Sequence, residues 1–394
     1  MKERLIFHID VNNAFLSWTA VDMLKKGAKI DIRTIPAIIG GDEETRHGIV
    51  LAKSPIAKKM GIKTGEPVYF AKQKCPGLKM FETNFECYKK YSNLLYNLFL
   101  EYTDKVERFS IDECFLDMTG SIYKSETPLS KAEEISNRIK NSYGFTVNIG
   151  IAHNKLLAKM ASDFEKPDKI HTLYENEIQS KMWPLPVSEL LFVGKKTSEK
   201  LNKMRINTIG DLAHSDKLLL INTFGKFGFQ MWQYANGIDN SEVNFKHEKP
   251  KSISTETTLP KNISNAEDLK KIIVKLVEEV SYRLRKENMK TSVIAVDLKT
   301  SDFRTYSHQN KLVNPTSNTK IILNEAKKLI DEMYSKEEIR LIGVRLDKLI
   351  DENCSKQISL FDQKENNKLD NLDKTIDNLN EKYGFNTIKR GINN

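Results

Sequence analysis

The strongest constraint on the fold lies between residues 251 and 349, where two hydrophobic periods follow one another in a fixed order. Strand-like patterns begin at Lys251 and return at 291–300, 303–312 and 339–349, and helical patterns cover 265–287 and 319–334. A period of two residues indicates a strand, and a period of 3.6 residues indicates a helix. The resulting order, β-α-β-β-α-β, is ferredoxin-like.

The first 168 residues predict a second unit, of the α+β class. It opens with Arg4–Asp10, a short apolar run that places a carboxylate at the tip of a strand. Gly40, Gly41 and Asp42 mark a turn in the next strand pair. Strands are expected within 34–53, 105–118 and 145–152, and helices at 15–26, 55–61, 85–105, 130–142 and 154–164.

The remaining segments are less regular. Residues 170–250 contain two helix–loop–helix patterns, one around Val193 and Gly194 and one around Phe224 and Gly225. Residues 350–394 are polar and charged, and we expect them to form a mobile tail.

Composition limits the kind of partner. The 394 residues include 62 basic and 53 acidic side chains, and the net charge of +9 favours an anionic partner, either nucleic acid or a membrane surface. No apolar run reaches the roughly 20 residues of a membrane span, and the N-terminus does not have the apolar stretch of a signal peptide. The four cysteines show no paired spacing and the seven histidines are scattered, so we expect a reducing, cytoplasmic setting and no zinc site.

Three acids are candidates for a metal site: Asp10 at its strand end, and Asp112 and Glu113 in the segment 105–118. Divalent cations such as Mg²⁺ need oxygen ligands close together. Neighbouring acids in a regular strand point to opposite faces, so Asp112 and Glu113 converge only at a bend, which we place near Ser110. Taken alone, these residues favour the simpler alternative of a solvated Asp-Glu pair at a hairpin end.

Two segments that contain these acids resemble the signature motifs of the Y-family DNA polymerases. They are Phe7–Phe15, with the sequence FHIDVNNAF, and Phe109–Asp117, with the sequence FSIDECFLD. Gly61–Pro67, Ile149–Lys159 and Ala161–Pro167 resemble three more stretches of that family, in the same order along the chain. The resemblance covers essentially the whole chain.

The resemblance implies a metal-dependent nucleotidyl transfer. Asp10, Asp112 and Glu113, together with the backbone carbonyl of Val11, would hold two Mg²⁺ ions, with Mn²⁺ as an alternative. One ion would activate the 3′-hydroxyl of the primer, and the other would neutralise the triphosphate and the leaving pyrophosphate.

The resemblance also implies a fold, a multidomain right-hand polymerase of the α+β class. It would have a ferredoxin-like palm, small fingers, a helical thumb with a helix-hairpin-helix, and a β-α-β-β-α-β little finger. The expected bounds are 1–10 and 85–168 for the palm, 11–84 for the fingers, 169–240 for the thumb, 241–250 for a linker, 251–350 for the little finger and 351–394 for the tail.

Phe15 stands five residues after Asp10, at the place of the family's aromatic steric gate. A ring beneath the sugar would clash with a 2′-hydroxyl and so select deoxyribonucleotides. The alternative is that Phe15 is the first core residue of a helix, and the two roles are compatible.

The triphosphate contacts depart from the family pattern. Lys166 matches the lysine that contacts the triphosphate, but the usual Tyr and Arg of the fingers align with Pro55 and Lys58. Lysine keeps the charge and loses the bidentate fork of arginine. Asn12 and Ala14 replace a frequent second Asp and a frequent aromatic residue, so nucleotide affinity is in question.

Binding of DNA is expected through two regions. Gly194 allows the tight turn of a helix-hairpin-helix, whose following helix directs free N–H groups at a phosphate. Lys195, Lys196 and Lys200 belong to a stretch, 195–205, with five basic residues and one acid. Residues 251–350 have 19 basic and 14 acidic side chains, which suits sequence-independent phosphate contacts.

The tail contains a second interaction motif. Gln357, Leu360 and Phe361 match the pentapeptide Gln-x-x-Leu-Phe with which bacterial polymerases bind the sliding clamp. Leu360 and Phe361 are adjacent apolar anchors in a polar stretch, which suits insertion into a partner's pocket. The alternative is that they fold back onto the preceding domain.

These observations predict a translesion DNA polymerase, a monomer that acts on primer-template DNA and dNTPs in the cytoplasm at the nucleoid. A catalytically weak subunit that docks on DNA and the clamp is the alternative, because the fingers residues are altered. Gly40–Glu44 resembles the signature of diguanylate cyclases, but its fifth residue is wrong and a Gly-Gly-Asp turn explains it.

Overall fold

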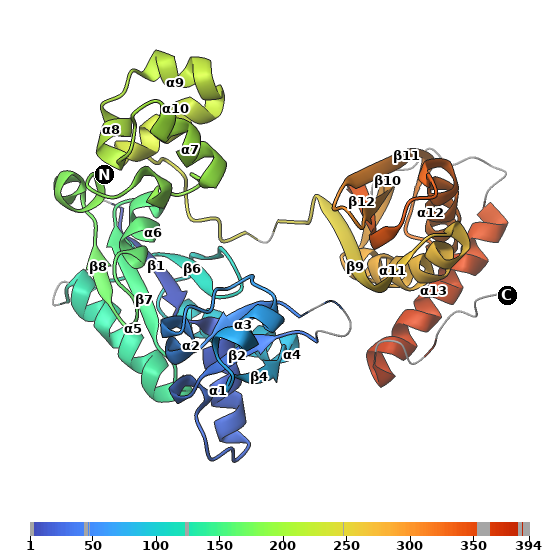
Figure 1. Cartoon of the computed structure of the whole chain (residues 1–394), viewed down its shortest axis with the longest axis horizontal. Coiled ribbons are helices and arrows are strands. Elements are labelled where there is room, and N and C mark those ends of the chain that lie inside the picture. Colours follow the sequence, from blue (N-terminus) through green and yellow to red (C-terminus); the bar gives the residue numbers. More distant parts are fainter. Residues whose placement is uncertain are drawn as a thin grey trace. The chain divides into compact units, whose positions relative to one another are not determined.

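The computed structural model describes residues 4–42, 46, 48–122, 126–246, 248–352, 363–384 and 388 (Figure 1). The chain divides into two compact units. The first comprises Met1–Gly41 and Ile49–Lys246, and the second comprises Asp42–Gly48 and His247–Asn394. Within the described residues, no helix is long and apolar enough to cross a membrane.

The first unit is built on a five-stranded sheet with the order β5-β6-β1-β7-β8. The central strand β1 is antiparallel to both β6 and β7. Counted along the chain, the first four strands of this sheet, β1, β5, β6 and β7, therefore lie in the order second, third, first, fourth, which is the ferredoxin-like arrangement predicted for the palm. The strands are β1 (Ile6–Val11), β5 (Val106–Arg108), β6 (Glu113–Asp117), β7 (Val147–Ala152) and β8 (Ile170–Thr172).

The side chains on the two faces of β1 pack against different helices. Phe7, Ile9 and Val11 join the core that packs under α1 (Ala14–Lys25), α4 (Phe85–Leu100) and α5 (Pro128–Tyr143). Because side chains alternate along a strand, His8 and Asp10 point to the other face. That face is covered by α6 (Lys155–Asp163), whose apolar residues form a separate core with Ile6 and Phe115.

Gly150 lets α6 approach the sheet closely. It lies on β7 opposite His8 in the strand register. A Cβ atom at this position would be 2.0 Å from the Ala158 carbonyl oxygen and 2.5 Å from the Ser162 amide nitrogen. The backbone of α6 therefore passes directly over the middle of the sheet, and its inward side chains reach β1.

A smaller part of the first unit carries the three-stranded sheet β3-β2-β4. Its core contains Ile38, Val50, Ala57 and Val68. The predicted strand–turn–strand is confirmed, whereas α3 and β4 were not predicted. The elements are β2 (Ala37–Gly40), β3 (Val50–Lys53), α2 (Pro55–Lys59), α3 (Val68–Lys74) and β4 (Lys79–Glu82).

The last part of the first unit is helical, as expected. Gly228 is needed for packing, since a Cβ atom there would be 2.1 Å from the Leu220 carbonyl oxygen, where α9 and α10 cross. The helices are α7 (Lys195–Lys203), α8 (Ile209–Ala213), α9 (Lys217–Phe224) and α10 (Lys226–Ala235).

The second unit confirms the order β-α-β-β-α-β along the chain but not the ferredoxin-like spatial order. Its sheet order is β11-β10-β12-β9, so the central strands are the second and the fourth. All three pairs are antiparallel, and one strand separates the two strands joined by each helix. The elements are β9 (Ser252–Ile263), α11 (Ala266–Lys286), β10 (Met289–Thr300), β11 (Thr305–Thr316), α12 (Thr319–Met333) and β12 (Ile339–Asp351).

The expectation of a mobile tail after residue 350 is wrong for its central part. Gln363–Tyr383 form a helix, α13, that lies alongside α11 and α12 (Figure 1). The guanidinium of Arg285 on α11 donates two hydrogen bonds to Asp377, of 2.6 and 2.8 Å. Asp373 is buried and accepts a 2.8 Å hydrogen bond from the backbone N–H of Thr319. Charged contacts, which hydropathy does not reveal, hold this helix in place.

Candidate active site

Asp10 and Glu113 lie directly opposite each other on neighbouring strands. They are Cα partners in the antiparallel register of β1 and β6, at the end of β1 and the start of β6. Their side chains point to the α6 face, where Asp10 is 7% exposed and the Glu113 side chain 19%. The structure therefore brings together two of the three acids predicted to hold metal.

Asp112 lies at the bend that was predicted near Ser110. The backbone N–H groups of Phe109 and Ser110 both donate to the Glu113 carbonyl, which closes a tight turn between β5 and β6. The Asp112 carbonyl accepts a 3.1 Å hydrogen bond from Val11, while its carboxylate accepts a 2.6 Å hydrogen bond from the Ser110 hydroxyl. Asp112 is thus adjacent to the other two acids through its backbone, with its carboxylate directed at its own turn.

Within the described residues, no group of three His, Cys, Asp or Glu side chains is arranged as a metal site. The donor set nevertheless fits a divalent cation. The buried Asp10 faces the partly buried Glu113, and a third, also partly buried acid, Asp112, stands beside them. Oxygen donors of this kind are those that Mg²⁺ and Mn²⁺ prefer.

Two lysines from α6 and the segment after it neutralise the acids. Lys159 Nζ lies 3.0 Å from Glu113 Oε2, 3.9 Å from Asp10 Oδ2 and 3.3 Å from Asp163 Oδ2. Lys166 forms an ion pair with Asp10 Oδ2 and another, of 2.8 Å, with Asp163 Oδ1. Lys166, predicted as a triphosphate ligand, therefore stands within the acid cluster. Lys159 was not predicted, although its spacing of four residues before Asp163 in a helix was visible in the sequence.

The pKa values of the two facing acids, Asp10 and Glu113, are shifted in opposite directions. Burial raises the pKa of Asp10 to about 6, against the opposing charges of Lys166 and Lys159. Burial also acts to raise the pKa of Glu113, but the hydrogen bond from His8 and the charge of Lys159 outweigh it and lower that pKa to about 2. Glu113 is therefore ionised throughout the physiological range, and Asp10 is the acid whose charge depends on its neighbours.

Phe15 stands in the first turn of α1 and is partly buried. Its ring packs against Tyr88, with 4.7 Å between ring centroids, and against Trp18, at 6.2 Å. The predicted core contact is thus present. The role as steric gate stays a prediction.

Pro55 and Lys58 belong to α2. The helix is capped by Ser54, whose hydroxyl accepts a 3.1 Å hydrogen bond from Ala57, and Pro55 occupies the first helical position, where proline is favoured. Lys58 is exposed. Burial and the charge of Lys58 lower the pKa of Lys53, so these two cations lie near each other.

The helix-hairpin-helix residues differ in their surroundings. Gly194 begins α7, with no side-chain cap on the helix. Lys195 and Lys196 are exposed, and Lys195 is 4.0 Å from Glu199. Lys200 instead donates a 3.0 Å hydrogen bond to the Thr223 carbonyl and lies over the Phe224 ring, so this lysine already has partners inside the protein.

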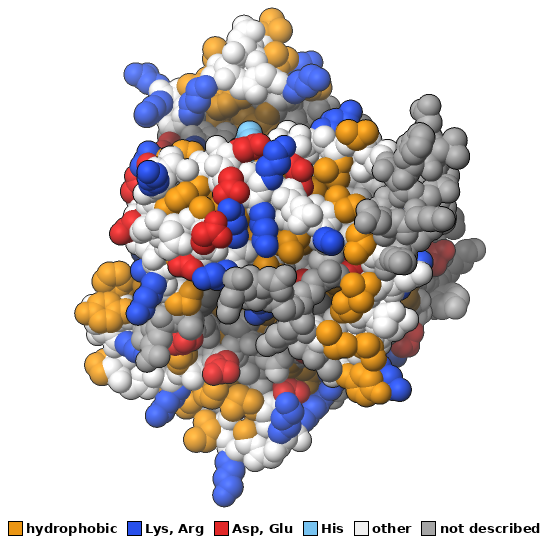
Figure 2. Space-filling view, turned by 90° about the vertical axis from the view of Figure 1, so that its right-hand side faces the viewer, with side chains coloured by type: hydrophobic (Ala, Val, Ile, Leu, Met, Phe, Trp, Pro, Cys, Tyr) orange, Lys and Arg blue, Asp and Glu red, His pale blue; other side chains and the backbone are white. Residues whose placement is uncertain are grey.

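Basic and acidic side chains are not separated on the face drawn in Figure 2. Basic side chains are interspersed there with acidic ones and with apolar patches. Gln357, Leu360 and Phe361 lie outside the described residues.

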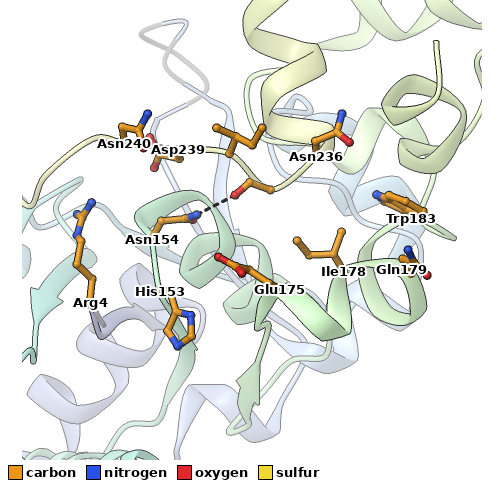
Figure 3. A pocket seen from close by; sticks show the side chains of 12 residues that line it. Arg4, His153, Asn154, Glu175, Ile178, Gln179, Trp183, Asn236, Asp239 and Asn240 are labelled. Carbon is orange, nitrogen blue, oxygen red and sulfur yellow. Dashed lines mark hydrogen bonds between the residues drawn. The ribbon is translucent and has the colours of Figure 1, made fainter. Parts of the chain in front are cut away.

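The first unit also contains a pocket of about 500 Å³ (Figure 3). Asp10, Asp112 and Glu113 are not among the residues that line it. Asn154 donates a 2.8 Å hydrogen bond to the Gly237 carbonyl, and Asp239 accepts one of 3.1 Å from the Leu156 amide. These contacts fasten the segment after α10 to the start of α6. The pocket is lined by Arg4, His153, Asn154, Glu175, Ile178, Gln179, Trp183 and residues 236–240, none of which we predicted as a site residue.

Comparison with known families identifies the class. The model of the impB/mucB/samB family matches residues 9–163, that of its C-terminal domain matches 250–360, and that of the IMS family HHH motif matches 175–206. A solved structure of a Y-family DNA polymerase chimera covers 88% of this chain and 99% of its own, with a TM-score of 0.78 and 24% identity, which shows the same fold. The chain belongs to the Y-family of DNA polymerases.

Relatives that match nearly the whole chain identify the activity more specifically. Over 389 residues the chain is 50% identical to a protein of Clostridium acetobutylicum named DNA polymerase IV, covering 99% of this chain and 98% of the relative. It is 37% identical over 392 residues to DNA polymerase IV 1 of Bacillus subtilis, covering 99% and 93%. The chain is thus a DNA-directed DNA polymerase, as the sequence predicted.

Proposed function

We propose that this polymerase extends a primer past damaged template bases by nucleotidyl transfer with two Mg²⁺ ions, for which Mn²⁺ can substitute. The observation that supports the proposal most directly is the pair formed by the buried Asp10 and the partly buried Glu113, held opposite each other beside Asp112. Divalent ions at these acids supply activation of the 3′-hydroxyl and neutralisation of the triphosphate. The Val11 carbonyl is the fourth proposed ligand.

The lysines of the cluster take part in nucleotide binding. Lys166 forms ion pairs with Asp10 and Asp163. Its ammonium group is partly exposed, so it can turn from Asp10 to a phosphate oxygen while Asp163 remains beside it. Lys58 supplies a second positive charge from α2. Lysine contributes a point charge to phosphate and not the fork of an arginine.

DNA is held by contacts to its backbone. The uncapped N-terminus of α7 at Gly194 and the exposed Lys195 and Lys196 suit a phosphate. Lys200, which hydrogen-bonds the end of α9, contributes by fixing the hairpin and by its charge. Contacts of this kind do not depend on base sequence and weaken with salt.

A second function is favoured by the fingers residues. If Pro55 and Lys58 bind the triphosphate too weakly, the chain is a DNA- and clamp-binding subunit with little activity of its own. Primer extension separates the two proposals. Extension on undamaged and on abasic templates by the purified chain supports the polymerase, and binding of DNA without extension supports the subunit.

The metal assignment is tested by Asp112→Ala and Glu113→Ala. Each should lower extension by at least about 10²–10³-fold, because a stabiliser of developing charge is lost, and should leave DNA binding unchanged. Glu86→Ala, which removes an exposed carboxylate at the start of α4, is the matched control and should keep full activity. More than about a tenth of the wild-type rate in either test variant would contradict the assignment.

The clamp is the proposed protein partner of a monomeric polymerase. The motif Gln357, Leu360 and Phe361 supports this proposal, and ordering a peptide limits its affinity to about the micromolar range. Leu360→Ala combined with Phe361→Ala should leave extension without a clamp unchanged and abolish stimulation by a loaded clamp. Equal stimulation of the double variant and the wild type would place the anchors elsewhere. Sedimentation of the chain alone should give a mass of one copy.

A further inference from the structure

His8 is a fully buried histidine beside the acid cluster, and it was not among the predicted site residues. Its ring is on the same face of β1 as Asp10, two residues away, and has no solvent exposure. Nε2 lies 3.2 Å from Glu113 Oε2, and Nδ1 lies 2.7 Å from the hydroxyl of Ser162 on α6. Both ring nitrogens therefore have polar partners inside the protein.

The chemistry of Glu113 defines the direction of its hydrogen bond with His8. A carboxylate oxygen can only accept, so Nε2 carries a hydrogen and donates it to Glu113. Nδ1 forms a 2.7 Å hydrogen bond with the Ser162 hydroxyl, whose single hydrogen is also within reach of the Lys159 carbonyl, at 2.8 Å.

The two carboxylate oxygens of Glu113 consequently differ in their contacts. Oε2 accepts a hydrogen bond from His8 Nε2, at 3.2 Å, and forms an ion pair with Lys159 Nζ, at 3.0 Å. In the described part of the chain, Oε1 accepts no hydrogen bond. Two donors on one oxygen leave the carboxylate little freedom to rotate and direct the other oxygen away from α6.

We propose that His8, held by Ser162, is a positioning residue that fixes the Glu113 carboxylate so that Oε1 is presented to a divalent cation. The inference rests on the proposed role of Glu113 as a metal ligand and adds the residues that orient it. Partners of this kind, which hold a ligand without touching the metal, contribute about 10–100-fold to metal affinity.

The fold explains why these groups meet. His8 and Gly150 are opposite each other on β1 and β7, and the absence of a side chain at Gly150 lets α6 lie against the sheet. Ser162 is fully buried at that contact, and its hydroxyl is also 2.8 Å from the Lys159 carbonyl. The same stretch of α6 thus carries the partner of His8 and the second donor to Glu113.

The experiment measures binding of Mn²⁺ alone to the full chain by electron paramagnetic resonance, without DNA or nucleotide. His8→Phe removes the donor and keeps a ring, and its Kd for Mn²⁺ should rise about 10–100-fold. His8→Gln retains an N–H donor and should restore part of the affinity. Ser162→Ala removes the partner of Nδ1 and should weaken binding in the same direction, by less.

The matched control is His171→Gln on β8, in the same sheet. Its Nε2 is buried without a hydrogen-bond partner. The variant therefore replaces a second histidine ring of the sheet, one that does not contact an acid of the cluster. Its Mn²⁺ affinity should equal that of the wild type. Thermal unfolding and near-ultraviolet circular dichroism of each variant verify the fold, and Ser162→Ala tests the proposal if His8→Phe is unfolded.

The kinetic readout separates positioning from structural damage. In primer extension, His8→Phe should raise the Mg²⁺ concentration for half-maximal rate and recover most of kcat at saturating Mg²⁺, whereas Glu113→Ala should not recover. If His8→Phe is folded and binds Mn²⁺ with wild-type affinity, the proposed role of His8 is wrong and the metal assignment is unaffected. If Glu113→Ala binds Mn²⁺ as tightly as the wild type, the metal assignment fails, and the role of His8 fails with it.

Discussion

The ring of Phe15 combines a packing contact with its proposed contact to a sugar. It rests on Tyr88, at 4.7 Å between centroids. Phe15→Ala should raise the kcat/KM for CTP relative to dCTP opposite template G, because the 2′-hydroxyl then meets no ring. The measurement is steady-state incorporation of single nucleotides.

Phe85 offers a matched control for this prediction. It is exposed at the start of α4 and packs on the same Tyr88 from another side, at 5.7 Å. Phe85→Ala should lose similar packing without changing the ratio for the two sugars. An unchanged ratio in Phe15→Ala would leave Phe15 as a packing residue alone.

Gly150 is the residue on which the approach of α6 depends. Gly150→Ala places a Cβ atom 2.0 Å from a backbone oxygen, so the helix must move. We expect a loss of about 1–3 kcal/mol or more in the free energy of unfolding, measured in urea. Gly77→Ala, where a Cβ atom meets nothing within 4 Å, should change stability far less. Equal losses would show that α6 adjusts without cost.

At the scale of elements, the ion pairs of α13 are the feature with the clearest consequence. The side chain of Asp373 is 2% exposed and that of Arg285 is 14% exposed. Arg285→Ala removes the guanidinium group that pairs with both Asp373 and Asp377. Removing one partner of a buried pair costs about 3–5 kcal/mol. We therefore expect the second unit to unfold at a clearly lower temperature.

Lys286→Ala is the control for Arg285→Ala. Lys286 follows on the same helix and is exposed, so its loss should change the unfolding temperature little. Similar destabilisation by both substitutions would mean that helix propensity, and not the contact with α13, is responsible.

The elements also show which kinds of information the sequence contains. The strands and helices of 251–349 were predictable because their apolar residues repeat at periods of 2 and 3.6 over long stretches. The bend at Ser110 followed from the need to turn two adjacent acids to one site. The sheet order of the second unit was not predictable, because the pairing of β12 between β9 and β10 joins strands that are distant in the sequence. The helix α13 was missed because its docking depends on charges, and Asp377 is 92 residues from Arg285.

In the candidate site, too, some residues were predictable from the sequence and others were not. Asp10, Asp112, Glu113 and Lys166 were found by their resemblance to family motifs, and the structure places two of the acids and the lysine together. His8 was missed because its partners, Glu113 and Ser162, lie 105 and 154 residues away. A single histidine in an apolar strand is indistinguishable from a core residue until the opposite strand and helix are known.

For the whole molecule, the division into two units predicts the course of thermal unfolding. Among the described residues, most of the buried apolar side chains of the second unit form one cluster, between Ile253 and Leu346, which contains no residue of the first unit. Units with separate cores unfold independently unless a large interface couples them. We expect two transitions in differential scanning calorimetry of the intact chain.

The two stabilities can be assigned with the variants above. Arg285→Ala should lower the temperature of one transition, and Gly150→Ala should lower that of the other. A single transition that both variants shift together would show that the units unfold as one.

The separate apolar cluster of the second unit also bears on how such genes change by recombination. A crossover in the codons for residues 244–250 would join the first 243 residues to the corresponding part of a relative, and it would divide no apolar cluster of either unit. A crossover inside β10 would instead leave half a core on each side. Recombination in nature should therefore pass intact second units between lineages far more often than fragments of them, so that the two parts of one polymerase gene can have different ancestries.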